Sequence, residues 1–435
     1  MNKPNIIFIV ADDHRASAVG RLGIEPVATP TLDALARRGT VLSQMRTMSG
    51  WCGAVSIPSR SCIHTGRDIK DVVAARPEDL DQAGFVLPET FPLMGEFFRK
   101  AGYATHGIGK WHNDAAAFNR SFSSGAAIFF GGMSDHDKVP LHDYRPEGDY
   151  SESNSRLGDG FSTEIFADAA VDFIQGHPGD APFLLYVALT SPHDPRTPPP
   201  PFDGIRAESI SLPPNFLSEH PFDNGEMDIR DEKLAAFPRE PEEIRQHIAD
   251  YYGMISHHDH QIGRILDALE QRGQKENTIV VYTADHGLAI GQHGLMGKQN
   301  LYEHSLRTPF IVAGPGIPVG GNVTGPAMEM DILPTLLDLA GVAPHADFDG
   351  LSFADAIAER SHSPRAFGHA LYGECQSMVT DGHWKLIRYR RVEGTGRGTN
   401  ARQLFHLAED PWEIHDLSST PGGQEQIARL EREIP

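Results

Sequence analysis

The sequence has little cysteine and no long hydrophobic run. Three cysteines in 435 residues cannot form a disulfide framework, and their odd number fits a reducing compartment. The first apolar run, Asn5–Val10, is far too short for a signal-peptide core or a membrane span. These absences exclude a disulfide-stapled scaffold. They predict a cytoplasmic protein without a membrane partner, unless a leader has been removed.

Positive charge is also scarce. The chain has 38 Lys and Arg against 59 Asp and Glu, a formal net charge of −21. This balance argues against a nucleic-acid partner, because phosphate backbones are bound by basic surfaces. A small anionic substrate is still allowed, since a local cluster of Arg, Lys and metal overrides the global sign. The length suits one large α/β unit with an appendage.

Short apolar runs alternate with helical patterns along most of the chain. The apolar runs are near-continuous, which is typical of strands covered on both faces in a parallel sheet. They are Asn5–Val10, Tyr103–Ile108, Pro182–Leu189, Thr278–Thr283 and Pro309–Ala313. The helical patterns are Thr31–Arg38, Phe91–Ala101, Ser162–Gln175 and Pro241–Arg272. The alternation predicts a doubly wound, mostly parallel α/β sheet.

Two stretches depart from this alternation. Ser191–Phe237 is rich in Pro, Asp and Glu and has little periodicity, which indicates a long surface excursion. From Ala343 onward the pattern changes to strand-like segments in His383–Val392 and Gln403–Leu417, followed by a helical pattern in Gln424–Glu433. We therefore expect a main α/β domain over residues 1–342. A C-terminal subdomain with a small antiparallel sheet and a helix is expected over residues 343–435.

Polar residues suited to chemistry follow four of the predicted strands. In open α/β sheets, ligands bind beyond the carboxyl ends of the strands. The residues at those ends are Asp12, Asp13, Lys110, His112, His193, Asp285 and His286. Each has an ordinary alternative explanation in a turn or a surface loop. Because four different strands are each followed by such residues, a functional site is favoured over four unrelated turns.

The residue types at these ends suit a metal and an anion. Asp12, Asp13 and Asp285 form a hard-oxygen cage for a divalent cation, with His286 able to complete it. Such a metal would neutralise an anionic ester oxygen as a Lewis acid. The remaining candidates are fixed positive charges or proton carriers near neutral pH: Arg60, Lys110 and Lys298, with His112 and His193.

Ser56 is the candidate nucleophile. Pro58 disfavours helical geometry at Ile57 but suits the first residue of a helix, which places Ser56 just before a helix N-terminus. Backbone N–H groups and the helix dipole favour an anion there. The alternative is that Ser56 serves only as an N-terminal cap.

The segment Ser56-Ile57-Pro58-Ser59-Arg60, followed by Thr65-Gly66-Arg67, resembles the sulfatase signature. In that signature, Cys or Ser is followed by x-Pro-Ser-Arg and later by Thr-Gly-Arg. The resemblance extends over most of the chain, through Asp12-Asp13, Gly109-Lys110-Trp111-His112, Ser191-Pro192-His193, Thr283-Ala284-Asp285-His286-Gly287, Gly297-Lys298, Leu301-Tyr302-Glu303, Trp384-Lys385 and Asp410-Pro411. It implies an alkaline phosphatase-like fold and hydrolysis of the sulfate ester of a saccharide or another small organic alcohol.

The resemblance also implies how the nucleophile and the metal are used. Ser56 would be oxidised to formylglycine by a Ser-type maturation enzyme, and the hydrate of that aldehyde attacks sulfur while Arg60 steadies it. The metal would be calcium, as in most relatives, with Mg²⁺ or Mn²⁺ as alternatives. His286 stands where many relatives have Asn. The implied metal ligands are Asp12, Asp13, Asp285 and His286.

The remaining implied roles concern the sulfate group. His112 would handle the proton of the hydrate, and Lys110 would complete the sulfate clamp. His193 and Lys298 would bind the sulfate and protonate the departing alcohol oxygen. The Ser form of the signature depends on a radical maturation enzyme in relatives. Cys52 lies four residues before Ser56, the first position of the signature, and is therefore expected to be structural.

Two other functions stay open. One is a phosphodiesterase or phosphonate monoester hydrolase on the same scaffold, because sulfate esters and phosphate diesters share charge and shape. The other is a non-catalytic binding protein that has lost maturation, or a dead site if Ser56 stays unmodified. The leaving group and the oligomeric state are not determined by the sequence.

Three further features have competing explanations. The cluster His257-His258-Asp259-His260 is expected to be a structural helix face rather than a metal site. The aromatic segment Phe129–Tyr150 lines the substrate entrance or is a solvent loop. The strand arginines Arg388, Arg390 and Arg391 recognise further anionic groups or are simply solvated.

Overall fold

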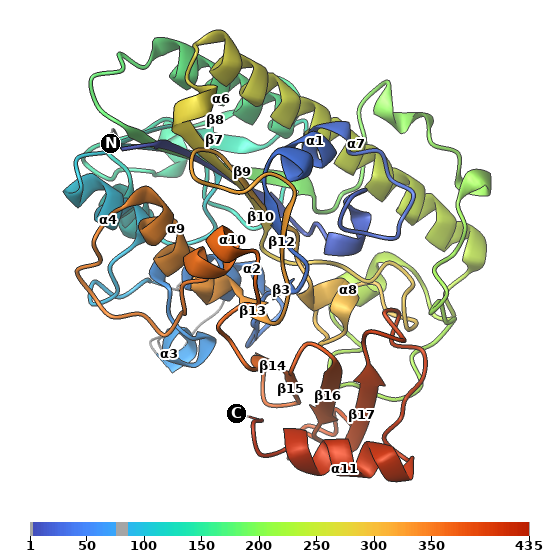
Figure 1. Ribbon diagram of the computed structural model, residues 1–435. Coiled ribbons are helices and arrows are strands. Elements are labelled where there is room, and N and C mark those ends of the chain that lie inside the picture. Colours follow the sequence, from blue (N-terminus) through green and yellow to red (C-terminus); the bar gives the residue numbers. More distant parts are fainter. Residues whose placement is uncertain (1–2, 75–85, 435) are drawn as a thin grey trace.

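A ten-stranded mixed sheet forms the centre of the main domain (Figure 1). The computed structural model describes residues 3–74 and 86–434. In spatial order the strands are β12 (Gly321–Val323), β2 (Thr40–Leu42), β11 (Phe310–Ala313), β10 (Thr278–Ala284), β1 (Asn5–Asp12), β9 (Phe183–Pro192), β5 (Ala104–Lys110), β6 (Ser124–Phe129), β7 (Pro140–His142) and β8 (Ser155–Leu157). Strands β10, β1, β9 and β5 run parallel, which confirms the predicted mostly parallel α/β class.

Strand β11 corrects one expectation. Its apolar run was predicted among the parallel strands, but β11 pairs antiparallel with β10 and with β2. Within the connection from β10 to β11 the structure forms only the single-turn helix α8 (Glu303–Leu306). That is too little for the helical crossover that a parallel neighbour requires.

Side chains of β1 alternate between two hydrophobic layers, as the period of a strand requires. Ile7 and Ile9 pack in the layer covered by α1 (Pro30–Arg38), α6 (Ser162–Gly176) and α7 (Pro241–Gln271). Ile6 and Phe8 pack in the layer formed with α2 (Ser56–Thr65), α4 (Met94–Lys100), α5 (Ala115–Ser121) and α9 (Ile332–Ala340). Figure 1 shows α1 and α7 on one side of the sheet and α2, α4 and α9 on the other.

A five-stranded sheet forms the C-terminal subdomain. Its order is β17 (Ala401–His406), β16 (Trp384–Tyr389), β15 (Gln376–Thr380), β14 (Gly368–Tyr372) and β4 (Ser49–Gly50). Helix α11 (Pro421–Leu430) packs against it. Strand β4 precedes Ser56 in the chain and pairs parallel with β14, so the subdomain contacts the segment of the candidate nucleophile. Helix α10 (Ala354–Glu359) packs on the main core, and the division at residue 342 stays a prediction.

The remaining elements are short. They are β3 (Met45–Arg46), β13 (Ala327–Met328), α3 (Ile69–Ala74) and the 3₁₀ helices η1 (Ala16–Ala18), η2 (Glu152–Asn154), η3 (Phe202–Gly204), η4 (Ala207–Ser209), η5 (Asp231–Leu234), η6 (Lys275–Asn277) and η7 (Glu329–Asp331). The excursion Ser191–Phe237 contains the end of β9 and the helices η3, η4 and η5. Among the helices of the described residues, none combines the length and apolarity needed to cross a bilayer.

Buried neutral histidines make the fold sensitive to acid. His64 in α2 packs against the rings of Trp111 and Tyr186, with centroid distances of 4.7 and 4.8 Å. Neither of its ring nitrogens has a hydrogen-bond partner in the described residues, and burial lowers its pKa to about 3. Burial also lowers the pKa of other histidines to about 4: His14, His106 and His136.

The direction of the pH effect follows from these lowered pKa values. Below the ordinary histidine pKa of about 6.5, the unfolded chain binds more protons than the folded chain, so stability falls as the pH drops. We expect the melting temperature to decrease from pH 7 to pH 5. The slope should shrink in His64→Leu by up to one proton, about 1.4 kcal/mol per pH unit. A melting temperature that is flat over this range would contradict the prediction.

Candidate active site

The carboxyl ends of four adjacent parallel strands bring the predicted residues together. Asp12 is the last residue of β1 and Lys110 the last of β5. His193 directly follows β9, and Asp285 directly follows β10. All four side chains are buried. The strand order β10-β1-β9-β5 therefore gathers residues that are far apart in the chain.

Asp12 and Asp13, which are consecutive in the chain, each accept a hydrogen bond from a different lysine. Lys110 Nζ donates to Asp12 Oδ2 and also to the carbonyl of Gly132, at 2.6 Å. Lys298 Nζ donates to Asp13 Oδ1 at 2.5 Å. Asp13 has a φ of 70°, a left-handed conformation that is uncommon outside glycine and frequent at functional sites. This turn directs two adjacent carboxylates to two different lysines.

Arg60 lies on α2, four residues after Ser56, and contacts residues at the ends of strands β10 and β5. Its Nε donates to Asp285 Oδ2 at 3.0 Å, and its Nη1 donates to the Lys110 carbonyl at 2.7 Å. Its Nη2 lies 4.0 Å from Asp12 Oδ1 and is buried without a hydrogen-bond partner in the described residues. Burial pushes the pKa of Asp285 up, but Arg60 and Lys110 outweigh it and hold that pKa well below its ordinary value. Asp285 is therefore ionised.

Ser56 is the first residue of α2, with Val55 as the N-cap. The helix begins two residues earlier than the predicted start at Pro58. Proline is tolerated there because N–H groups of the first turn have no acceptor within the helix. Ser56 Oγ donates to Asp12 Oδ1 at 3.4 Å. Ser56 is thus not the N-terminal cap, and its hydroxyl faces the cluster.

His112 lines the same cavity as Ser56, and its ring is neutral. Its backbone φ is 52°, and its Nδ1 is buried without a partner among the described residues. Burial, followed by the nearby charges of Lys110 and Arg60, lowers its pKa well below the ordinary value. The neutral ring of His112 is suited to accept a proton, which is one of the two roles expected of a proton carrier.

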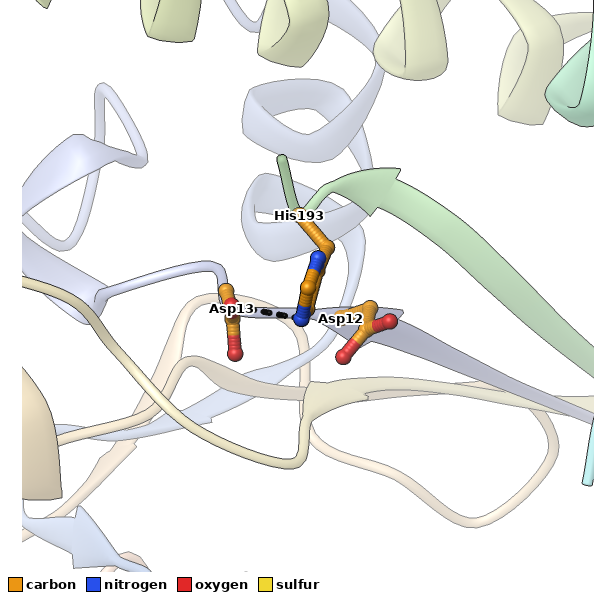
Figure 2. A group of neighbouring side chains, drawn as sticks. All are labelled: Asp12, Asp13 and His193. Carbon is orange, nitrogen blue, oxygen red and sulfur yellow. Dashed lines mark ion pairs between the residues drawn. The ribbon is translucent and has the colours of Figure 1, made fainter. Parts of the chain in front are cut away.

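His193 points at both aspartates of the first strand. Figure 2 shows its ring reaching from the end of β9 towards Asp12 and Asp13. Ligand atoms of these three residues lie within 4.8 Å of one another. Its Nδ1 contacts the Asp194 carbonyl at 2.8 Å. Because a carbonyl only accepts, Nδ1 carries a proton, and Nε2 lies 3.7 Å from Asp13 Oδ2.

Asp285 and His286 lie outside this closely spaced group of the described residues. His286 Nε2 is 3.2 Å from the Val55 carbonyl and so carries the proton. Its Nδ1 is buried and has no partner in the described part of the chain. A ring with one N–H fixed by a carbonyl and one free lone pair is what a metal-ligating histidine presents. The close group that the structure forms is therefore Asp12, Asp13 and His193, and the predicted ligand set of Asp12, Asp13, Asp285 and His286 stays a prediction.

A cavity of about 1140 Å³ opens from the cluster. Ser56, His112, His193 and Lys298 are among the residues that line it. Its other lining residues include Phe130, Met133, His142, Tyr150, Glu152, Arg230, Asp231 and Gln299. The aromatic segment Phe129–Tyr150 therefore lines the entrance, and the excursion Ser191–Phe237 contributes a polar wall. Sequence reasoning missed Arg230 and Asp231 because that excursion has no periodicity to place them.

Glu329 is a second residue that the sequence did not indicate. Its Oε2 is 2.7 Å from Ser59 Oγ, which also lies 2.9 Å from the Asp285 carbonyl. One hydroxyl proton cannot serve two acceptors, so a protonated Glu329 completes the chain of hydrogen bonds. Burial accordingly raises the pKa of Glu329 to about 7. Glu329 supports the loop that carries Asp285.

Two other sequence features lie away from this cluster. Asp259 in α7 accepts the backbone N–H groups of Thr31 and Leu32 at 2.9 and 2.8 Å and so caps α1. This confirms the structural explanation for the histidine-rich part of α7. Arg388 and Arg390 line hollows on the C-terminal sheet and do not line the cavity beside Ser56.

Comparisons with known proteins agree with this geometry. The sulfatase family model matches residues 4–342, and the model for the C-terminal part of N-sulphoglucosamine sulphohydrolase matches residues 291–435. The chain is 26% identical to N-acetylglucosamine-6-O-sulfatase of Bacteroides thetaiotaomicron, over 99% of this chain and 85% of that protein. It is 29% identical to an arylsulfatase of Clostridium perfringens, over 99% of this chain and 93% of that protein.

A solved structure shares the fold over nearly the whole chain. That protein, in complex with its substrate D-glucosamine-2-N,6-O-disulfate, superimposes with a TM-score of 0.82 at 23% identity. The alignment covers 99% of this chain and 97% of that one. The family model spans far more than half of the residues and includes every strand end that forms the cluster. The chain belongs to the sulfatase family.

Proposed function

We propose that this protein hydrolyses sulfate esters, with a sulfated saccharide as the substrate class. The observation that carries the proposal is the buried Nη2 of Arg60. It has no hydrogen-bond partner in the described residues and lies in the cluster that Ser56 Oγ faces through Asp12. An unpartnered buried guanidinium N–H is costly unless an anionic oxygen binds it in the working enzyme. The names of the glucosamine and aryl sulfatase relatives support the same chemistry.

The nucleophile in this proposal derives from Ser56. A Ser-type maturation enzyme would oxidise Ser56 to formylglycine, whose hydrate supplies the attacking oxygen. The position of Ser56 at the N-terminus of α2 places backbone N–H groups where negative charge develops. His112, neutral at rest, accepts a proton from the nucleophile. Arg60 holds the same group through Nη2.

The net charge of the cluster allows a cation and an anion to bind there together. Three carboxylates are balanced by three basic groups, Arg60, Lys110 and Lys298. A divalent cation, calcium by its preference for carboxylate oxygens, would be held by Asp12, Asp13, Asp285 and His286 and would neutralise charge on the sulfate. With these groups balanced, an anionic ester that binds together with the dication limits the net charge of the buried site to +1 instead of +2, which lowers the cost of burial.

Lys298 is the proton donor to the departing alcohol oxygen in this proposal. Burial acts to lower its pKa, but Asp13 and Asp12 outweigh burial and raise it above the ordinary value. Lys298 therefore stays charged. Nε2 of His193 lies 3.7 Å from Asp13, which also accepts from Lys298. Burial lowers the pKa of His193, so its neutral ring does not serve as the acid that the resemblance implies, and Lys298 alone is the donor to the leaving group.

Peptide mass spectrometry tests the proposed nucleophile. Protein from the native host is digested with trypsin, and the fragment Thr47–Arg60 is analysed. Loss of H₂ at Ser56, or trapping by a hydrazide reagent, supports formylglycine. An intact serine in active enzyme would rule out the formylglycine mechanism and move attention to phosphoryl or phosphonyl esters. Turnover of a sulfate ester and a phosphodiester with one common leaving group separates those two activities.

Removal of the divalent metal is expected to abolish most activity. Chelation should lower kcat/KM by about a hundredfold or more, because metal neutralisation of an ester oxygen contributes several kcal/mol. Activity should return on addition of Ca²⁺, with Mg²⁺ and Mn²⁺ as comparison ions. The measurement is turnover of a sulfate ester before and after dialysis against EDTA. Full activity after exhaustive chelation would contradict a metal-dependent mechanism.

A further inference from the structure

We propose that the cavity selects sulfate esters whose alcohol part carries no second anionic group. This inference rests on the proposed sulfatase function and concerns the same cavity. Arg60, Lys110 and Lys298 are the basic groups of the cluster beside Ser56. The lining of the cavity also includes aromatic side chains of the segment Phe129–Tyr150 and charged side chains such as Arg230 and Asp231. A second anionic group on the alcohol part would need a positively charged partner among these side chains.

Arg230 is a cation of the cavity lining, and most of its donors are used within the chain. Its Nε donates to Asp231 Oδ1 at 2.9 Å. Nη1 contacts Asp194 Oδ2 and Met133 Sδ, each at 2.6 Å. Nη2 donates to Asp194 Oδ1 at 3.0 Å and to Asp231 Oδ1 at 2.5 Å. Four of the five N–H groups of the guanidinium thus point at carboxylate oxygens and the fifth faces a thioether, so a second sulfate or carboxylate would have to displace one of these carboxylates to bind Arg230 fully.

The charges around Arg230 are predominantly negative. Two carboxylates, Asp194 and Asp231, are paired with this guanidinium, and the buried Arg196 also attracts both of them. Glu152 on η2 and Asp114 at the start of α5 also line the cavity. Among the described residues of the lining, the other charged base is Lys298, which is paired with Asp13. A second anion would meet unbalanced like charge, which weakens binding.

The aromatic side chains supply a surface for an uncharged ring. The rings of Phe130 and Tyr150 lie 4.7 Å apart between centroids, and His142 lies 5.5 and 5.8 Å from them. The Tyr150 hydroxyl donates to Asn119 Oδ1 at 2.7 Å, which fixes the orientation of its ring. A pyranose or aryl ring can pack its apolar face against this group. Shape and charge together fit a monosulfate with a neutral or positively charged ring.

The test uses two aryl sulfates that differ by one isosteric group. A 4-nitrophenyl sulfate with a ring carboxamide is compared with the analogue that has a carboxylate at the same position. We expect the mature enzyme to prefer the carboxamide by at least about tenfold in kcat/KM. Glu152→Lys adds a free cation to the cavity wall and should shrink this preference severalfold. The intrinsic reactivity of the two esters cancels in the comparison between enzymes, and the wild-type ratio is corrected by the ratio of the uncatalysed hydrolysis rates of the two esters.

Glu208→Lys is the matched control. Glu208 is exposed, lies in the 3₁₀ helix η4, and does not line the cavity, so it changes the net charge equally and should leave the ratio unaltered. A wild-type enzyme that turns over the carboxylate as well as the carboxamide would overturn the inference while the sulfatase function stands. Equal shifts of the ratio in the two variants would also overturn it. Absence of turnover on both esters by formylglycine-containing enzyme would count against the proposed function itself.

Discussion

Replacement of Ser56 by alanine is expected to lower sulfate-ester turnover by more than about 10⁴-fold without unfolding the protein. Loss of a catalytic nucleophile typically has an effect of this size or larger. Ser56 Oγ makes a long hydrogen bond of 3.4 Å to Asp12, so its loss should cost at most about 1 kcal/mol of stability. Alanine is also a favourable helical residue. The measurements are kcat on an aryl sulfate and thermal unfolding of both proteins.

Ser61→Ala is the appropriate comparison on the same helix. Ser61 Oγ donates to the Ile57 carbonyl at 2.7 Å and lies 3.0 Å from the Asn113 side-chain amide, and it has no place in the proposed chemistry. Its variant should keep turnover within the same order of magnitude. If Ser56→Ala retained the activity of wild type, the hydroxyl at this position would not supply the nucleophile.

Arg60→Ala is expected to destabilise the fold and to remove activity together. The buried carboxylate of Asp285 would lose the guanidinium that bonds it at 3.0 Å, and the Lys110 carbonyl would lose its donor. Removal of one partner from a buried ion pair typically costs about 3–5 kcal/mol. Urea unfolding measures the loss of stability, and ester turnover measures the loss of the group that holds the nucleophile.

Arg60→Lys separates these two effects. Lysine keeps a positive charge beside Asp285 and should recover part of the stability. An ammonium cannot reproduce donors in three fixed directions, so activity should stay low. Full stability in Arg60→Ala would show that Asp285 does not depend on this partner. Full activity in Arg60→Lys would remove the Nη2 group from the proposed mechanism.

Local sequence was sufficient to predict the central strands and most of the cluster. A parallel strand in the middle of a sheet is covered on both faces, so its sequence is a continuous apolar run. The run Asn5–Val10 lies within β1, and Thr278–Thr283 lies within β10. Since parallel strands end at one edge of the sheet, the polar residues that follow them were expected to meet. Asp12 and Asp285 do lie in one cluster, through their shared neighbour Arg60.

Features that depend on contacts between distant segments could not be predicted in this way. The antiparallel direction of β11 depends on how the preceding loop packs, and the pairing of β4 with β14 depends on a register between remote residues. Glu329 has no local motif that marks it as a partner of Ser59. The start of α2 at Ser56 likewise depends on backbone contacts that the proline alone does not specify.

The sequence by itself determined the α/β class, the strand ends and the chemical types gathered there, because each is encoded in residues close together in the chain. Only the tertiary structure decided which partner each of these groups has. It paired Lys110 with Asp12 and Lys298 with Asp13. It also directed four of the five N–H groups of Arg230 at carboxylates. Charge partners and free donors depend on distances of a few ångströms between segments, and those distances are set by the packing of the whole chain.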